Sequence, residues 1–464
     1  MGVDPHESWK TLRELLSDAS ERAVRFLESL PERRVGAECG TDDLVRSLGG
    51  TLPPSGQPAS EILARLDEIG HRGVVASAGP RYFGFVTGGA LPSSLAANWL
   101  AAAWDQNAFS ETASPIAAAV ESIAMRWVLE LLQLPTNAGV AFVTGATMAN
   151  FSALAAARRS VLLAHGYDVD RSGLHGAPKI TVVAGEQAHA TLFKAFGMLG
   201  LGRDRVILVP TDEQGRMRAS ALPDLTGPAI VCTQAGNVNT GAFDPVGAIC
   251  DAVHARDVWI HVDGAFGLWA RASQRYGESA RGVERADSWA TDAHKWLNVP
   301  YDSGLAIVQD SDALRCAMSM QADYLPEHEG RQPFDFTPEA SRRARGLEIW
   351  AAIASLGSGG VEELVDRSCR HARRFAEALS RAGHQILNQV ALNQVLVSFG
   401  DDLTTSEVIR GVQRDGTCWC GGTRWNGRTA MRISVSSWAT TDEDVERSVA
   451  AILSVADEAT RRRR

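Results

Sequence analysis

The sequence predicts an α/β fold with a mainly parallel central sheet and flanking helices. Three observations lead to this prediction. Five short apolar segments alternate with helical patterns, as in consecutive βαβ units. Most of these segments are apolar throughout, which is typical of strands buried on both faces of a sheet. The chain has 464 residues, of which 45% are hydrophobic and 22% charged, so it is long enough and apolar enough to bury a large core.

The expected elements follow in chain order. Apolar residues recur at helical intervals over residues 8–30, and Pro31 ends this pattern. Ser114 and Pro115 match the N-cap and first position of a second helix, whose apolar stripe continues to Leu132. Strands are expected at 140–143, 180–184, 206–209, 229–233 and 258–263, with a helix at 148–159 after the first strand.

After residue 350 the pattern changes to a smaller α+β unit. A helical stretch precedes a strand at 394–399, and residues 424–429 have the composition of a hairpin turn before an alternating strand at 431–436. A final helix is expected at 441–456. We therefore divide the chain into an N-terminal helical segment (1–85), a large domain (86–350) and a small C-terminal α+β domain (351–464).

Charge and composition argue against several classes of partner. Asp and Glu (55) outnumber Lys and Arg (46), giving a net charge of −9, which disfavours nucleic acid as a partner. Neither a signal peptide nor an uncharged apolar run of membrane-spanning length is visible, so no membrane partner is expected. Seven cysteines are scattered without zinc-site spacing, which predicts free thiols, no metal site and a cytoplasmic location.

The most informative residues are Asp263 and Lys295. Asp263 follows the fifth apolar strand, and ligands bind at such carboxyl ends in open α/β sheets. Lys295 is one of only four lysines and lies in an apolar stretch. A lysine held in an apolar site becomes a nucleophilic amine, able to form a Schiff base with pyridoxal 5′-phosphate (PLP), while an aspartate pairs with the pyridinium nitrogen. Taken singly, a surface lysine and a helix-capping aspartate are simpler explanations.

From about residue 80 to about 440 the sequence resembles the group II PLP-dependent amino acid decarboxylases, which include aromatic-L-amino-acid, glutamate and tyrosine decarboxylases. The resemblance rests on His261-Val-Asp263 followed by His294-Lys295-Trp296. It implies PLP fold type I, with the large domain binding PLP through a Schiff base on Lys295. It also implies that Asp263 contacts the ring nitrogen and that Ala265 packs beneath the ring.

Further family positions match in order. Residues 187–189 resemble the segment whose histidine stacks on the PLP ring, so His189 is expected to stack there and to guide protons near the α-carbon. Residues 144–150 resemble the phosphate loop, at a strand-to-helix turn that favours an anion. The phosphate ligands implied by the resemblance are Ala146, Thr147, Ser288 and His294.

The resemblance also indicates how a substrate is held. Tyr324 matches a tyrosine on a loop that closes over the family's site, here residues 321–333, and its phenol is thought to protonate the carbanion after CO2 leaves. Related aldehyde synthases have Phe there, so Tyr324 favours decarboxylation. Thr87 and Phe109 match the substrate wall and slightly favour an aromatic or bulky L-amino acid, although core packing explains them equally well. An acidic substrate, which would need an arginine in the pocket, stays open.

The chain departs from the family at two places. Where the family usually has Gly-Thr-Thr, Val238 replaces the threonine expected at the cofactor's O3′, and Asn237 or Asn239 could take its role. The usual Asn-Pro before the His-Lys pair is Asp292-Ala293 here. These departures bear on substrate and reaction specificity more than on PLP binding.

The predicted function is PLP-dependent decarboxylation of an L-amino acid to the amine and CO2. Alternatives at the same carbanion are transamination and oxidative decarboxylation to an aldehyde. A non-catalytic PLP-binding homologue and an unrelated α/β binding protein are alternatives of another class. The family completes its site across a dimer, with N-terminal helices clasping the partner. The resemblance therefore implies a homodimer, with segment 1–85 in dimerisation.

Overall fold

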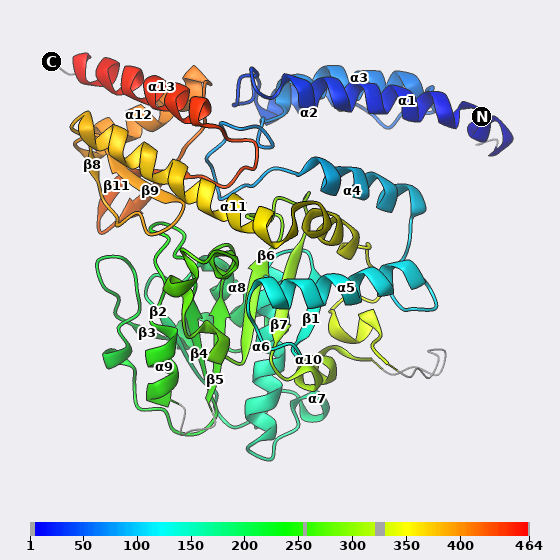
Figure 1. The fold of residues 1–464 in the computed structure, drawn as a ribbon. Coiled ribbons are helices and arrows are strands. Elements are labelled where there is room, and N and C mark those ends of the chain that lie inside the picture. The colour runs from blue at the N-terminus through cyan, green and yellow to red at the C-terminus, as the bar shows by residue number, and fades with distance from the viewer. Residues whose placement is uncertain (1–4, 254–257, 321–329, 463–464) are drawn as a thin grey trace.

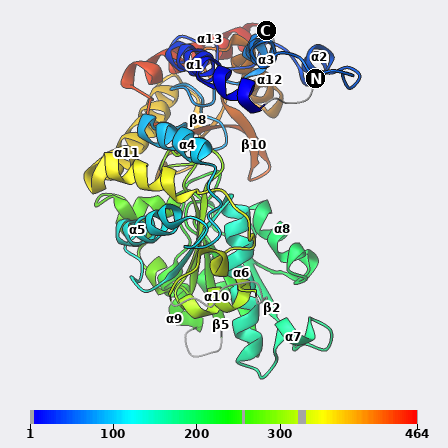
Figure 2. The ribbon, with the colours of Figure 1, turned by 90° about the vertical axis from the view of Figure 1, so that its right-hand side faces the viewer.

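The computed structural model describes residues 5–253, 258–320 and 330–462. A seven-stranded sheet lies at the centre of the larger part, below a smaller part built on a four-stranded sheet (Figure 1). The first three helices lie at the far end of the smaller part, beside its last helix (Figures 1 and 2). They are α1 (Pro5–Ser29), α2 (Thr41–Leu48) and α3 (Ala59–Gly73).

The large sheet has the strand order β1-β7-β6-β5-β4-β2-β3. Its strands are parallel except β7, which pairs antiparallel with both β1 and β6. The prediction of a mainly parallel sheet is confirmed, although β6 and β7 were not assigned from the sequence. The strands are β1 (Gly139–Val143), β2 (Thr181–Gly185), β3 (Ile207–Val209), β4 (Ala229–Gln234), β5 (Val258–Asp263), β6 (Ser288–Asp292) and β7 (Gly304–Val308).

Helices cover both faces of this sheet, as the apolar strands require. The predicted N-cap is confirmed, since the Ser114 side chain accepts a hydrogen bond from the Ala117 N–H at the start of α5. The helices of this part are α4 (Pro92–Trp104), α5 (Pro115–Leu131), α6 (Ala146–Leu163), α7 (Val169–Ser172), α8 (Ala190–Met198), α9 (Val246–Val253), α10 (Ser311–Met318) and α11 (Gly346–Arg381).

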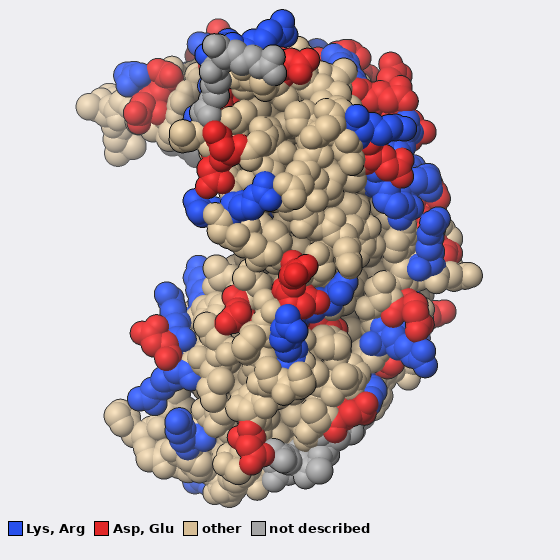
Figure 3. All heavy atoms as spheres, turned by 90° about the vertical axis from the view of Figure 1, so that its left-hand side faces the viewer, with Lys and Arg blue, Asp and Glu red and all other residues tan. Residues whose placement is uncertain are grey.

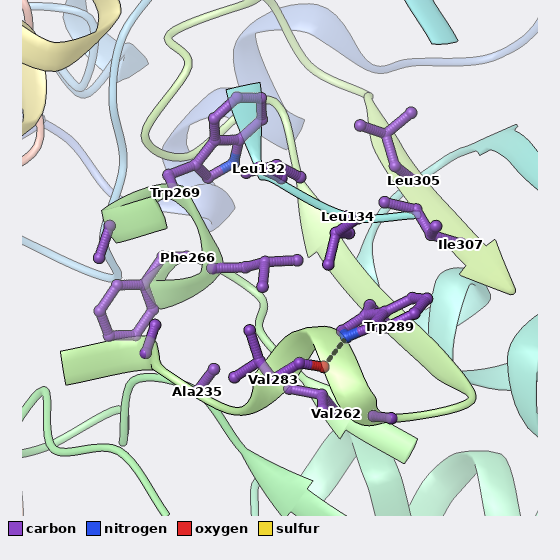
Figure 4. Close-up of a cluster of buried hydrophobic side chains, with 14 of the residues drawn as sticks. Leu132, Leu134, Ala235, Val262, Phe266, Trp269, Val283, Trp289, Leu305 and Ile307 are labelled. Atoms are coloured by element: carbon purple, nitrogen blue, oxygen red, sulfur yellow. Dashed lines mark hydrogen bonds between the residues drawn. The ribbon is translucent and has the colours of Figure 1, made fainter. Parts of the chain in front are cut away.

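Large apolar side chains of β6 and β7 pack in a buried hydrophobic cluster on the sheet (Figure 4). Trp289 on β6 is fully buried, pairs in register with Ile307 on β7, and donates its Nε1–H to the Val283 carbonyl over 2.7 Å. Burial of each such side chain stabilises the fold by about 1.5–3 kcal/mol. This packing matters for function because the chain segment after β6 carries Lys295.

The small part has an antiparallel sheet of order β10-β11-β9-β8. The predicted hairpin turn is confirmed: Asn426 and Gly427 have φ of 47° and 78°, as a type I′ turn requires. Its elements are β8 (Gln385–Ile386), β9 (Gln394–Ser398), α12 (Asp402–Asp415), β10 (Gly421–Trp425), β11 (Arg428–Ser434) and α13 (Asp442–Arg461).

Two features bear on the proposed division of the chain. The proposed boundary at residue 350 falls inside α11, whose helical path is interrupted at Gly357 (φ 62°). At the other boundary, Tyr82 stacks on Trp419 and Phe83 packs in the core of the small part. The end of segment 1–85 is therefore integrated with the C-terminal sheet.

The surface combines mixed charge with apolar residues on the N-terminal helices. Acidic and basic side chains are interspersed on the face seen in Figure 3, whose outline is hollowed on one side. On α1, Trp9 is 74% exposed, and Leu16 and Val24 are exposed as well. Among the described residues, no helix is both long and apolar enough to cross a membrane.

Candidate active site

A cavity of about 610 Å³ lies at the carboxyl ends of the parallel strands, facing β10 and β11 of the small part. It is lined by residues at or just after the ends of β1, β4, β5 and β6, as expected for an open α/β sheet. Seven predicted site residues meet in its wall: Ala146, Thr147, His189, Asp263, Ala265, His294 and Lys295.

Asp263 ends β5 and is almost fully buried. Its Oδ1 accepts the Ala265 N–H and its Oδ2 accepts the Asn150 side-chain N–H, each over 3.3 Å. Burial raises the pKa of Asp263, and the nearby His189 and Lys295 oppose that rise. A cation that faces this carboxylate in the cavity would keep it ionised. The protonated ring nitrogen of PLP is such a cation, and it needs an ionised partner.

Behind Asp263 runs a buried hydrogen-bonded chain that the sequence analysis missed. The Asn150 amide donates to Asp263, so its Oδ1 must accept from Nε2 of His261, 2.8 Å away. Nδ1 of His261 must then accept from the Ser288 hydroxyl (2.9 Å), whose oxygen accepts the Trp259 Nε1–H (2.8 Å). Burial lowers the pKa of His261 to about 3, so this ring is neutral, as the chain requires.

This arrangement corrects the assignment of Ser288 to the phosphate cup. Ser288 is fully buried at the start of β6, whereas the cavity lies at the other end of that strand, at Asp292. Four strand steps separate the two residues by about 13 Å. The hydroxyl is also already bonded to Trp259 and His261, so its role is to support Asp263 from behind.

The surroundings of Lys295 also differ from the expected apolar site. Its Nζ lies 2.8 Å from Oδ2 of Asp292, a side chain only 3% exposed. Oδ1 of Asp292 accepts the Ala146 N–H over 2.5 Å and lies 3.5 Å from Nε2 of His294. Because Nδ1 of His294 accepts the Ser303 N–H, the neutral ring carries its proton on Nε2, facing Asp292.

His189 caps α8 and lines the cavity. Its Nδ1 accepts from the Thr191 backbone N–H (3.3 Å) and lies 2.7 Å from the Thr191 hydroxyl. The proton of the neutral ring therefore sits on Nε2. Burial lowers the pKa of His189, although Asp263 counteracts part of that effect. The result is a neutral ring held at a defined angle by its own helix.

The turn between β1 and α6 forms an anion cradle. Ala146 and Thr147 lie in the first turn of α6, where backbone N–H groups have no helical partner. A Cβ on Gly145 would lie only 3.1 Å from His294 Cε1 and 3.2 Å from Asp292 Oδ1. Glycine keeps this space open. Together with Lys295 and Asp263, the cradle fits a phosphorylated, ring-containing aldehyde such as PLP.

The two predicted substrate residues do not line the cavity of the described chain. Thr87 is buried, with its hydroxyl 3.4 Å from that of Tyr301. Phe109 stacks on Phe334 with 4.6 Å between ring centroids. The described apolar wall is instead formed by Phe85, Val86, Val238 and Phe266. Tyr324 and positions 321–329 of its expected loop lie outside the described residues.

Residues 237–239, which depart from the family pattern, differ in whether they reach the cavity. Asn237 is buried and donates to Gln234 Oε1 over 3.0 Å, whereas Val238 and Asn239 line the cavity. Asn239 accepts the Thr423 hydroxyl over 2.9 Å, so of the two asparagines it is the one placed to meet a ligand. Beside it, the half-buried Arg432 also lines the cavity and donates to the Val238 carbonyl.

Residues 42–400 match the family model described as the pyridoxal-dependent decarboxylase conserved domain. The chain belongs to this family. It is a PLP-dependent carboxy-lyase of fold type I that acts in amino acid metabolism, and PLP is its cofactor. The expected family, fold class, enzyme class and cofactor are confirmed.

Relatives of this decarboxylase carry different substrate names. An aromatic-L-amino-acid decarboxylase from Bacillus atrophaeus is 27% identical over 388 residues, covering 81% of this chain and 78% of the relative. An acidic amino acid decarboxylase from Bos taurus is 28% identical over 361 residues, covering 75% of this chain and 68% of the relative.

Solved structures with the same fold also differ in reaction. Oryza sativa TDC with PLP and tryptamine superposes with a TM-score of 0.90 at 23% identity, covering 98% of this chain and 99% of that one. Rhodiola rosea 4-hydroxyphenylacetaldehyde synthase superposes with a TM-score of 0.84 at 21% identity, covering 98% and 99%. At these identities the structures establish the fold alone.

Proposed function

We propose that this enzyme decarboxylates an aromatic or otherwise bulky L-amino acid to the amine and CO2. The observation that carries the proposal is the meeting of Lys295, Asp263 and His189 in one cavity. A nucleophilic amine, a buried carboxylate and a neutral imidazole are the groups that PLP-dependent bond cleavage at Cα requires from a protein.

Each residue has a distinct task in this proposal. Lys295 would hold the cofactor covalently, Asp263 would hold a proton at its ring nitrogen, and the N-terminus of α6 would hold its phosphate. When bound, PLP supplies the sink for the electron pair left at Cα as CO2 departs. The Nε2–H of His189 is available to orient a substrate group or pass a proton near Cα.

The cavity wall supports the substrate class. Phe85 is 62% exposed at the cavity and lies against Trp419, with 5.5 Å between ring centroids. Phe266 and Val86 add further apolar surface. Such a wall favours an aromatic side chain through burial of apolar area and ring contacts.

One observation favours a second candidate, an acidic substrate. Arg432 lines the same cavity, and an arginine there is what an acidic side chain would need. CO2 release from L-tryptophan, L-tyrosine, L-phenylalanine, L-glutamate and L-aspartate separates the two candidates. Release from an aromatic amino acid alone supports our proposal. Release from an acidic amino acid, lost in Arg432→Gln but kept in Phe85→Ala, refutes the aromatic assignment.

We further propose a homodimer with shared active sites. The apolar side chains exposed along α1, with Trp99 and Leu100 on α4, would be covered by the partner's helices. Light scattering after size-exclusion chromatography should give twice the 49.7 kDa chain mass, and a monomer at micromolar concentration would contradict the proposal. We also propose a cytoplasmic location, supported by seven cysteines that are all unpaired.

A further inference from the structure

Asp292 places a carboxylate inside the cradle suited to the cofactor's phosphate. Its Oδ1 accepts the N–H of Ala146, the first residue of the 18-residue helix α6. The side chain is 3% exposed and lines the same cavity as Thr147 and Lys295. A phosphate bound by the first-turn N–H groups of α6 would therefore lie against a buried carboxylate.

A carboxylate and a phosphate in contact repel each other strongly when neither carries a proton. The second pKa of a phosphate is near 6, so the free phosphate is mostly a dianion at pH 7.5. The Asp292 carboxylate would repel the dianion more than the monoanion, and a buried site screens this repulsion far less than water does. One shared proton removes this conflict and converts the contact into a short charge-assisted O–H···O⁻ hydrogen bond.

We propose that Asp292 is a cofactor-phosphate ligand that makes PLP bind as the phosphate monoanion. The phosphate keeps one proton and donates it to the Asp292 carboxylate. When the dianion is the free species, that proton is taken up from solvent on binding and returned on release. The proposal rests on PLP as the cofactor and is independent of which amino acid is the substrate.

The charged and titratable groups around Asp292 leave the carboxylate able to accept this proton. Lys295 pairs with Oδ2, and attachment of the cofactor would withdraw this amine from the pair. His294 presents Nε2–H to Oδ1, and burial lowers its pKa. Asp302 acts electrostatically on His294. The remaining charged or titratable groups of the cavity wall are His189, Asp263 and Arg432.

Phosphorus NMR of the holoenzyme tests the proposal directly, because the ³¹P shift reports phosphate ionisation. In the wild type, the bound resonance should stay at the monoanion position from pH 6.5 to 8.5. In Asp292→Asn, which can donate to a dianion, it should lie at the dianion position above pH 7. The control Asp312→Asn removes the same charge at an exposed site on α10 and should behave as the wild type.

Cofactor affinity gives a second readout. The dissociation constant of PLP for the wild type should rise about tenfold or more between pH 7 and 8.5, because binding takes up a proton that is increasingly scarce as the pH rises. The dissociation constant for Asp292→Asn should change less than about twofold over the same range. A dianion resonance in the wild type at pH 7.5 would overturn the proposal even if Asp292→Asn failed to fold. So would identical resonances in the two proteins.

Discussion

Replacing Asn150 by Ala probes the hydrogen-bonded chain behind Asp263. The variant removes the N–H that Asp263 Oδ2 accepts over 3.3 Å and the oxygen that accepts from His261 over 2.8 Å. Both partners are buried, so water does not replace the lost bonds. Each buried group left unsatisfied costs about 1–3 kcal/mol. We therefore expect the free energy of unfolding to fall by about 3 kcal/mol.

Ser152→Ala is the matched control. Ser152 lies on the same helix, is equally buried, and its hydroxyl has no hydrogen-bond partner among the described residues. Because this substitution removes an unsatisfied hydroxyl and leaves no polar group without a partner, it should not lower the free energy of unfolding.

Urea denaturation at fixed protein and PLP concentrations measures both variants, with circular dichroism and the visible cofactor band as probes. Loss of the Asn150 donor also raises the pKa of Asp263 further, so cofactor affinity should weaken in Asn150→Ala alone. The reasoning fails if Asn150→Ala loses less than 1 kcal/mol, or no more than Ser152→Ala.

Three further predictions concern the chemistry and its pH dependence. Lys295→Ala should abolish both the visible absorption band of bound PLP and CO2 release. The control Lys194→Ala should keep both. A retained band in Lys295→Ala would contradict covalent attachment at this residue. Tyr324→Phe should shift products from amine toward aldehyde and ammonia, and an unchanged product ratio would count against its assigned role as proton donor. For His261, the unfolded side chain binds a proton near pH 6.5 but the folded one only near pH 3; the stability it provides is therefore present above pH 6.5 and falls by up to about 1.4 kcal/mol per unit below it. Denaturation midpoints at pH 7, 6 and 5 should thus approach those of His261→Gln as the pH falls, and parallel curves would refute the neutral-imidazole assignment.

Five strands of the large sheet and seven residues of the cavity were predictable because their signals are local. Apolar runs report burial, so all five strands predicted for the large domain are present. The α6 cradle follows from a strand-to-helix turn, and Asp263 from its place at a strand end. By contrast, β6 carries Ser288, Thr291 and Asp292 and so lacks the apolar run of a buried strand. The strand β7 has the length and apolar composition of β1 and could have been predicted from the same signal.

Other residues were misplaced or missed because their partners lie far away along the chain. Ser288 follows a family-like motif, yet its hydroxyl faces His261 and Trp259 on the neighbouring strand. Asn150 could have been noticed as a polar residue in an alanine-rich helix, since a buried amide needs partners. Even so, its partners His261 and Asp263 could not have been identified without the packing of α6 on the sheet.

The sequence by itself determined the fold class and seven of the residues that line the cavity, and its resemblance to a family predicted PLP as the cofactor. It could do so because strand burial, helix starts and short motifs are local features of the chain. Only the tertiary structure decided what each side chain faces. It places Asp292 between Lys295 and the α6 N-terminus, moves Ser288 behind Asp263, and brings Arg432 into the cavity from the small part. The contact between Asp292 and Ala146 joins segments more than a hundred residues apart. The contact between Ser288 and His261 depends on which face of its strand each side chain occupies. Such arrangements are selected by the close packing of the whole chain, which no short segment records.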